Sequence, residues 1–240
     1  MLSTDAIRRM RSSLLWDVRL QLRNGFYTAT AVVLGVWAVI AVWLPPVDLR
    51  WLLPALVSGN LVINTFFFMA ALVLLENEEG SLQARTVTPL RRGEYLAAKL
   101  ISLGALALAE NLLIVVLLHG TGFSLLAMAT AILLASVHYT LIGFIAVARY
   151  DSLNTFLMPS ILYSAAAQIP LIAWLLQWRH PLLYLHPLHA PLVISDIALR
   201  GGALFTVAFA VVISVAWTAV LLAGAQIAFV RLNMRLTVAA

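Results

Sequence analysis

Cysteine is absent from this chain of 240 residues, and charge is scarce, since 10% of the residues are charged and 63% are hydrophobic. Without cysteine there is no disulfide framework and no thiolate site. A mean hydropathy of +0.99 with so little charge lies outside the range of a domain whose surface must be wetted by water. The composition therefore predicts one all-α polytopic membrane domain over residues 1–240.

Sequence motifs for catalysis and nucleotide binding are also missing. The chain has no G-x-x-x-x-G-K-[ST] phosphate loop, no H-E-x-x-H helix and no G-x-S-x-G elbow. We therefore expect that this chain is not an enzyme and that it does not bind ATP through a phosphate loop. No short apolar run with a small-residue cleavage site follows the N-terminal arginines, so we expect no cleavable signal peptide.

What the chain does contain is long apolar runs, six of which are long enough to cross a bilayer. They cover residues 26–44, 52–75, 99–118, 123–147, 153–177 and 203–230. Pro159 and Pro170 lie inside the fifth run, where each removes a backbone donor, so this span is predicted to be kinked or broken. No internal repeat of the kind found in secondary transporters is evident.

The N-terminal segment, residues 5–24, is amphipathic rather than spanning. Its apolar residues recur at three- and four-residue steps and form one stripe, and its arginines lie mostly away from that stripe. The stripe consists of Ile7, Met10, Leu14, Val18 and Leu22. This pattern predicts a basic helix lying flat in the membrane interface. The alternative is a solvent-facing helix in a cytosolic extension.

Residues 178–202 are too apolar for an ordinary loop and too interrupted for a span. They predict short broken helices, re-entrant or interfacial, before the last span. His186 and His189, with His180 and Asp196 nearby, raise the alternative of a metal site, which would need three or four preorganised ligands. Prolines between the histidines prevent one helix from presenting them on one face, so we expect no metal here.

The distribution of positive charge predicts the topology. Twelve of the fifteen Lys and Arg residues fall on the side of both termini and the 76–98 loop, and three fall on the opposite side. Cytoplasmic loops carry an excess of Lys and Arg, so we expect both termini and this loop to be cytoplasmic. The net charge of +5 is then a topology signal, and we expect no nucleic-acid partner.

The longest polar stretch, residues 76–99, lies between the second and third spans. Gly80 permits a tight turn, and Ser81 is suited to cap a short helix over residues 82–87 that Thr88-Pro89 would end. Charge pairs of Glu76 or Glu78 with Arg85 or Arg91 would brace it. Such a short, hinged helix is rigid enough to transmit a push. The alternative is a solvated loop whose charge only marks the cytoplasmic side.

The amino-acid sequence of this stretch resembles that of the loop between spans two and three of ABC-2 type permeases. The matching patterns are E-x-E-x-G-S-L, V-T-P-L-R and E-Y-L-x-x-K, carried by Glu76, Glu78, Gly80, Thr88, Pro89, Glu94 and Lys99. The length of the chain and TPLRRGEY resemble the small bacterial multidrug-type permeases, including the fluoroquinolone-export group. One departure is Ala97-Ala98, where many relatives carry a glycine.

The resemblance implies a permease subunit of an ATP-driven exporter in the bacterial cytoplasmic membrane. The loop would dock on a separate ATP-binding subunit, which would hold ATP and Mg, so this chain would need no cofactor of its own. The implied coupling residues are Glu76, Glu78, Gly80, Ser81, Leu82, Arg85, Val87, Pro89 and Arg91.

A second permease copy or a paralogue would complete the complex. Its substrates would be hydrophobic or amphipathic, drug-like molecules or lipids, taken from the cytoplasm or the inner leaflet. The alternative function is a non-transporting membrane sensor or scaffold that recruits a cytoplasmic partner through the 76–98 loop.

Glu110 lies in the third span, eleven residues after Lys99, roughly 16 Å further along a helix. An acid near the bilayer midplane is costly and marks a candidate functional site. Two interpretations stay open. In one, Glu110 faces a substrate cavity together with Asn60 and Asn64. In the other, it makes a buried hydrogen bond between helices, to one of these asparagines or to His138 or Gln168.

Overall fold

The computed structural model describes residues 4–43, 48–82, 91–178 and 180–239, and every regular element in these ranges is helical. In chain order the elements are α1 (Thr4–Arg23), α2 (Phe26–Trp43), α3 (Leu53–Leu61), the π-helix η1 (Val62–Phe67), α4 (Phe68–Glu78), α6 (Arg92–His119), α7 (Leu125–Val147), α8 (Leu153–Ala167), α9 (Ile169–Leu175), the 3₁₀-helix η2 (Pro181–Leu185), α10 (His189–Arg200) and α11 (Leu204–Ala239). The predicted all-α class is confirmed.

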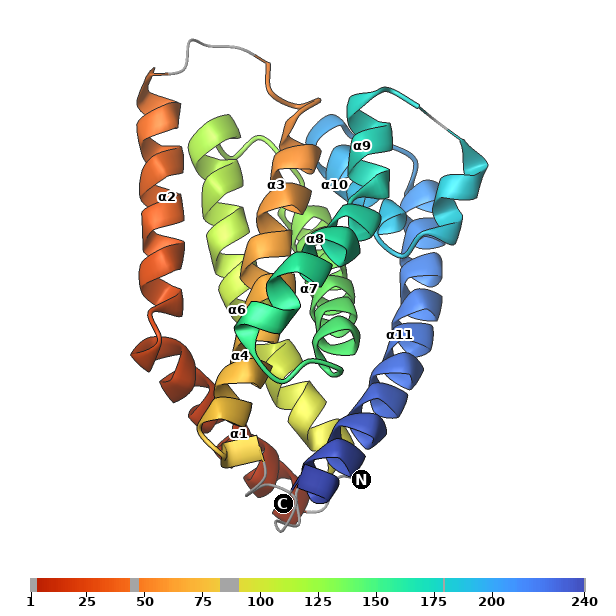
Figure 1. Cartoon of the computed structure of the whole chain (residues 1–240). Helices are drawn as coiled ribbons and strands as arrows, with labels where there is room; N and C mark the ends of the chain where they lie inside the picture. The colour runs from red at the N-terminus through yellow and green to blue at the C-terminus, as the bar shows by residue number, and fades with distance from the viewer. Residues whose placement is uncertain (1–3, 44–47, 83–90, 179, 240) are drawn as a thin grey trace.

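Within these residues five helical rods are long and apolar enough to cross a membrane, and the bent pair α8–α9 brings the number to six. The five are α2, the continuous rod α3–η1–α4, α6, α7 and α11. Figure 1 shows the two termini together at one end of the bundle, where α1 also lies. The polytopic architecture predicted from the apolar runs is therefore confirmed.

Helix α7 lies at the centre of the bundle. It packs against α6, α10, α11, η1 and α4, and its Tyr139 and Phe144 side chains are completely buried. In contrast, α2 and α11 expose most of their apolar surface. In a bilayer, apolar side chains on an outer helix face lipid tails or another protein, so their exposure needs no further cover from this chain.

The third span begins earlier than the sequence predicted, at Arg92 rather than at residue 99. Polarity suggested a loop here, but the Glu94 carboxylate accepts a hydrogen bond from the Arg91 backbone N–H at 3.0 Å. This bond satisfies one of the free donors at the helix start and extends α6 by seven residues. The last span likewise continues to Ala239 instead of ending at residue 230.

The fifth span is broken as predicted, and the two prolines differ in effect. α8 and α9 meet at an angle of 52° beside Gln168, and Pro170 lies in the first turn of α9. Proline has no N–H to donate to the carbonyl oxygen four residues before it, and its ring clashes with that carbonyl, which accounts for a break just before Pro170. Pro159 lies inside α8 without interrupting it.

The segment after this break folds back into the bundle at the end opposite the termini (Figure 1). Its helix α10 packs against α7, α11 and α3. The Ser124 N–H, just before α7, donates to the Ala198 carbonyl oxygen of α10 at 2.9 Å. The short broken helices predicted before the last span are therefore present as η2 and α10.

Candidate functional site

Buried charge gathers near the end of the bundle that carries the termini. The Lys99 Nζ atom of α6 lies 3.1 Å from Asp17 Oδ1 of α1 and 3.0 Å from Glu76 Oε1 of α4. None of these three side chains has exposed surface. The Tyr95 hydroxyl donates to Glu76 Oε2 at 2.7 Å, and its ring centre lies 4.9 Å from Nζ. We refer to Asp17, Glu76, Tyr95 and Lys99 as the Lys99 cluster.

The cluster forms because α1 turns a polar face towards the protein. Residues four apart lie on one side of a helix, so Ser13, Asp17 and Gln21 share a face, and all three are buried. Gln21 Nε2 donates to Ser102 Oγ of α6 at 3.0 Å. The predicted apolar stripe of α1 lies beside this face, and its last member, Leu22, is exposed.

Two further ion pairs hold α1 in place. The Arg9 guanidinium donates to both oxygens of Glu94 in α6, at 2.7 and 3.0 Å. Arg23 forms an ion pair with Glu79 at the end of α4. A fork-shaped contact such as that of Arg9 fixes orientation as well as charge. α1 is thus tied to both helices that flank the 83–90 segment.

Four of the predicted coupling residues lie in this cluster or at the turn that follows α4. Glu76 belongs to the cluster, and Leu82, just after the turn, is 2% exposed. Gly80 has a φ of 69°, a conformation that glycine adopts without strain. The Ser81 hydroxyl donates to the Glu76 carbonyl oxygen at 3.2 Å. Ser81 therefore binds back to α4 at the turn.

The remaining predicted coupling residues contribute less to this arrangement. Glu78 is exposed at the end of α4, and Arg91 is the exposed residue that precedes α6. Arg85, Val87 and Pro89 lie outside the described residues, as does the predicted helix beyond Leu82. Glu76 forms an ion pair with Lys99, a partner that the sequence did not indicate. The predicted pairs with Arg85 lie outside the described residues.

A second polar cluster lies in the middle of the bundle around Glu110. Asn60 Nδ2 donates to Glu110 Oε1 at 3.1 Å, and Asn64 Nδ2 donates to Oε2 at 2.7 Å. Asn60 also donates to Asn111 Oδ1 at 3.2 Å. All four side chains are buried. The structure thus brings the three predicted cavity residues together and gives Glu110 both asparagines as hydrogen-bond partners.

The other two partners predicted for Glu110 lie elsewhere. His138 Nε2 contacts the Ser214 carbonyl oxygen and Thr218 Oγ1, each at 3.0 Å. Gln168 Oε1 accepts from the Tyr139 hydroxyl at 3.0 Å. His138 and Gln168 therefore each have a hydrogen-bond partner of their own away from Glu110, as is favoured where water is absent.

The π-helix η1 contributes to the geometry at Glu110. Asn60 lies near the end of α3 and Asn64 lies in η1, so the two asparagines are four residues apart and face the same way. Single π-turns inside longer helices are frequent at functional sites. The wider turn carries Asn64 against α6 and η1 itself against α7.

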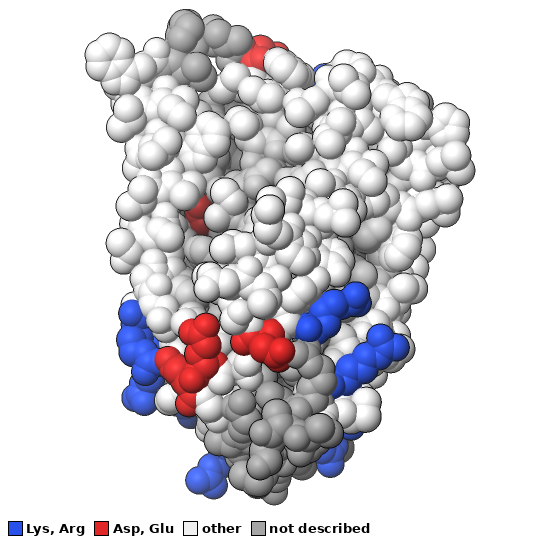
Figure 2. Space-filling view, viewed as in Figure 1, with Lys and Arg blue, Asp and Glu red and all other residues white. Residues whose placement is uncertain are grey.

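A groove of about 380 Å³ opens beside this polar cluster. Val33 and Trp37 of α2 form one side, Leu56 of α3 and Leu171 of α9 the other, and Asn60 also lines it. The surface is hollowed between α2 and α3 in Figure 2. Asn60 therefore connects an apolar groove at the side of the bundle with the Glu110 carboxylate.

The histidines after the fifth span do not assemble a metal centre. His180 Nδ1 accepts from the Leu182 N–H and His186 Nδ1 accepts from the Leu188 N–H, each at 3.2 Å. Backbone donors thus occupy these ring atoms. Across the part of the chain that the structure describes, no three His, Asp or Glu side chains lie close enough to hold a metal ion.

Comparison with known proteins gives this architecture a family. The fluoroquinolones export permease protein family matches residues 8–235. Two relatives named fluoroquinolones export permease protein, from Mycobacterium tuberculosis strains CDC 1551 / Oshkosh and ATCC 25618 / H37Rv, are each 32% identical over 228 residues. The match covers 93% of this chain and 95% of each relative. The resemblance to this group is confirmed, and the chain belongs to the fluoroquinolones export permease protein family.

Proposed function

We propose that this chain is the membrane-spanning subunit of an ABC-2 type exporter in a bacterial cytoplasmic membrane. The observation that carries the proposal is the Lys99 cluster, because it joins α1 to both helices that flank the 83–90 segment. Figure 2 shows charged side chains gathered at the end with the termini and a nearly uncharged surface above them. In our proposal this end faces the cytoplasm.

A separate ATP-binding subunit supplies the energy, and a second permease copy or a paralogue completes the complex. The 76–98 loop is where the ATP-binding subunit docks. When that subunit moves, the push reaches α4 and α6 together, because Glu76 and Lys99 are joined by a buried ion pair. A buried pair of this kind fixes geometry even where its net contribution to stability is small.

Leu82→Asp tests this coupling. Leu82 is buried beside Gly80 and Ser81, and a carboxylate there would lose its apolar contacts. We expect export by the complete complex to fall about tenfold or more, the effect of losing a buried interface side chain that contributes about 2 kcal/mol of binding free energy. ATP hydrolysis without substrate continues, and adding Val87→Asp deepens the loss. Export and hydrolysis are measured together in lipid vesicles.

Leu82→Met is the matched control, because it keeps an apolar side chain of similar volume and is expected to keep export. Normal membrane insertion of each variant is checked first. Undiminished export by Leu82→Asp would show that the loop is only a linker.

The substrate in this proposal is an amphipathic drug-like molecule, and fluoroquinolones are the first candidates because the relatives are named for their export. The apolar groove beside Asn60 would receive the hydrophobic part. Glu110 and its two asparagines would meet a polar or cationic group. Sites of this kind combine an apolar lining with a few placed polar groups.

Glu110→Gln is expected to lower export of an amine-bearing fluoroquinolone about tenfold, the loss that corresponds to about 1.4 kcal/mol of binding. The change removes the charge and keeps the size of the side chain. The glutamine oxygen still accepts from one asparagine, and its amide nitrogen, a donor, can be met if Asn64 turns its amide to present Oδ1, which makes no hydrogen bond to the described residues. Accumulation of drug in cells that carry the complete transporter measures the effect.

Glu79→Gln provides the comparison, because Glu79 lies at the charged end and pairs with Arg23, away from the proposed cavity. If Glu110→Gln exports every substrate normally, Glu110 has no part in the cavity and serves only to join the helices.

The competing function is a sensor or scaffold that recruits a cytoplasmic partner without transport. Co-purification with the ATP-binding subunit, followed by ATPase assays over a panel of amphipathic compounds in lipid, separates the two. Stimulation by transported compounds supports the exporter. Stable purification without an ATPase, and with no effect of any compound, supports the scaffold.

A further inference from the structure

A second cavity, of about 430 Å³, lies at the end of the bundle opposite the termini. It is enclosed by the end of α9, the segment with η2 and the outer face of α10. This volume falls in the range of small-molecule sites. The cavity is distinct from the groove at Asn60, with which it shares no lining residue.

A tight turn at the end of α9 shapes this cavity. The Gln177 N–H donates to the Trp174 carbonyl oxygen at 3.0 Å and the Trp178 N–H donates to that of Ala173 at 2.8 Å. This pair of bonds forms a Schellman ending of α9. Gln177 has a φ of 56°, where glycine is the usual residue. A non-glycine residue keeps a positive φ only where the surrounding structure stabilises that conformation. Here the turn places Trp174 and Trp178 on the cavity wall.

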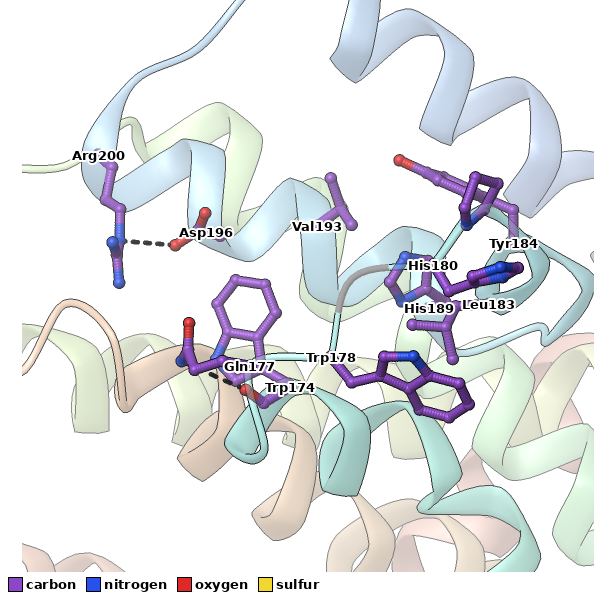
Figure 3. A pocket seen from close by; sticks show the side chains of 11 residues that line it. Trp174, Gln177, Trp178, His180, Leu183, Tyr184, His189, Val193, Asp196 and Arg200 are labelled. Carbon is purple, nitrogen blue, oxygen red and sulfur yellow. Dashed lines mark hydrogen bonds and ion pairs between the residues drawn. The ribbon is translucent and has the colours of Figure 1, made fainter.

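Aromatic side chains line much of the cavity. Figure 3 shows Trp174 beneath α10, with Trp178 further along the wall and Tyr184 at the far end. The Trp174 Nε1–H donates to the Trp51 carbonyl oxygen at 2.9 Å, which fixes this ring. Tyr184 packs edge-on against His189, with ring centres 4.7 Å apart. Fixed aromatic faces of this kind bind other flat rings by offset or edge-to-face contact.

His189 adds a polar atom to the same lining. Burial, and to a lesser extent the neighbouring His186, lowers the pKa of His189 to about 4. Its ring is therefore neutral at neutral pH. The buried Nδ1 atom makes no hydrogen bond to the described residues. A ligand in the cavity would offer this atom a partner.

The opposite end of the cavity carries an ion pair between Arg200 and Asp196, in which the guanidinium can still donate hydrogen bonds. Arg200 Nε lies 2.7 Å from Asp196 Oδ1, and the Arg200 side chain is 40% exposed against 23% for Asp196. This ion pair engages Nε. Within the described ranges no hydrogen bond is made by the two terminal amino groups of the guanidinium, which can therefore meet other acceptors. Of the acidic residues that the structure describes, Asp196 is the one that forms an ion pair with Arg200. A carboxylate is the group that matches this planar donor pair.

From this arrangement we propose that the cavity binds a planar aromatic carboxylate, with its ring system on Trp174 and Trp178 and its carboxylate on Arg200. A cationic ligand is disfavoured, because Asp196 is engaged by Arg200 while the guanidinium is the more exposed partner. A second arginine, Arg50, lines a separate neighbouring cavity that Arg200 also borders, where Asp48 pairs with Arg50. The site does not depend on export, since it lies within one chain.

Equilibrium dialysis of the full-length chain in lipid nanodiscs tests the site directly, with empty nanodiscs to subtract partitioning into lipid. Three probes share one ring system: 2-naphthoate, the neutral 2-naphthamide and the cationic 2-(aminomethyl)naphthalene. We expect saturable binding of 2-naphthoate, with 2-naphthamide about tenfold weaker because it lacks the charge-assisted contact. The amine is expected to bind more weakly still.

Variants locate the binding. Arg200→Gln should weaken 2-naphthoate about tenfold and leave 2-naphthamide unchanged. Trp178→Ala should weaken both, and since Trp178 is 58% exposed this change leaves the fold intact. Arg50→Gln is the matched control, because Arg50 is exposed, also pairs with an aspartate, Asp48, and does not line the aromatic cavity. It should leave all three probes unaffected.

Three results would overturn the proposal. They are tightest binding by the amine, equal losses from Arg200→Gln and Arg50→Gln, and an absence of saturable 2-naphthoate binding above empty nanodiscs. Because no ATP and no partner subunit are involved, failure here leaves the exporter proposal standing, and failure of drug-stimulated ATPase activity leaves this site standing.

Discussion

Replacing Lys99 by methionine is expected to destabilise the protein strongly. The ammonium group lies between Asp17 and Glu76, and none of the three side chains is exposed. Removing one partner of a buried ion pair costs about 3–5 kcal/mol, because the remaining charge stays in a medium that solvates it poorly. For a chain of this length such a loss lowers Tm by roughly 10 °C. Heating the detergent-purified protein and following its monodisperse fraction measures the shift.

Two variants show that the effect comes from the buried charge. Arg92→Met also replaces a cationic side chain by methionine on the same helix, but at an exposed position, and should stay within about 0.5 kcal/mol of the parent. The triple variant Asp17→Asn, Glu76→Gln, Lys99→Met buries no charge and should recover part of the loss. A Lys99→Met protein as stable as the parent, or a triple variant less stable than the single one, would contradict this account.

Replacing Gly143 by alanine is expected to have the next largest effect on stability. A Cβ atom at this position in α7 would lie 2.7 Å from the carbonyl oxygen and 3.1 Å from the Cα of Phe66. Both are backbone atoms of η1, so a rotamer change cannot relieve the contact and the two helices must separate. Overpacking of this kind typically costs about 1–3 kcal/mol. Because η1 carries Asn64, we also expect lower export, measured beside Tm.

Gly104→Ala separates this contact from a general effect of adding a methyl group to a buried helix. Gly104 is buried in α6, but a Cβ there would meet its nearest atom, Ser136 Oγ, at 3.5 Å, which is an ordinary contact. Alanine is also the better helix former by up to about 1 kcal/mol, so this variant should be at least as stable as the parent. If Gly143→Ala matches it, the close approach of α7 to η1 tolerates a methyl group.

The positions of the spans could be predicted because they depend on local composition. A run of apolar residues that is long enough to cross the bilayer forms a helix whatever its neighbours are, since its backbone must satisfy its own hydrogen bonds in lipid. The break of the fifth span at Pro170 was predictable for the same local reason. The start of α6 was not, because Glu94 stabilises it through Arg91 and through Arg9, which is far away in the chain.

Some residues of the candidate sites could likewise be recognised in the sequence, and others only in the folded structure. Glu110 stands out in the sequence, since an acid within an apolar run is rare enough to be noticed. Asp17 does not, because on an amphipathic basic helix an aspartate resembles any exposed polar residue. Only the packing of α1 on α6 buries it against Lys99. The cavity at Arg200 likewise depends on how α9, η2 and α10 meet.

The sequence by itself therefore determined that this is an all-α membrane protein with five or six candidate spans, an amphipathic N-terminal helix and broken helices before the last span. Each of these follows from interactions within a single segment and its solvent. The tertiary structure alone decided which polar groups meet: Lys99 with two carboxylates, Glu110 with two asparagines, and Arg200 with a wall of aromatic rings. Those contacts join segments far apart in the chain, and their formation depends on helix rotations and on close approaches, such as that of Gly143 to Phe66, which no local pattern specifies.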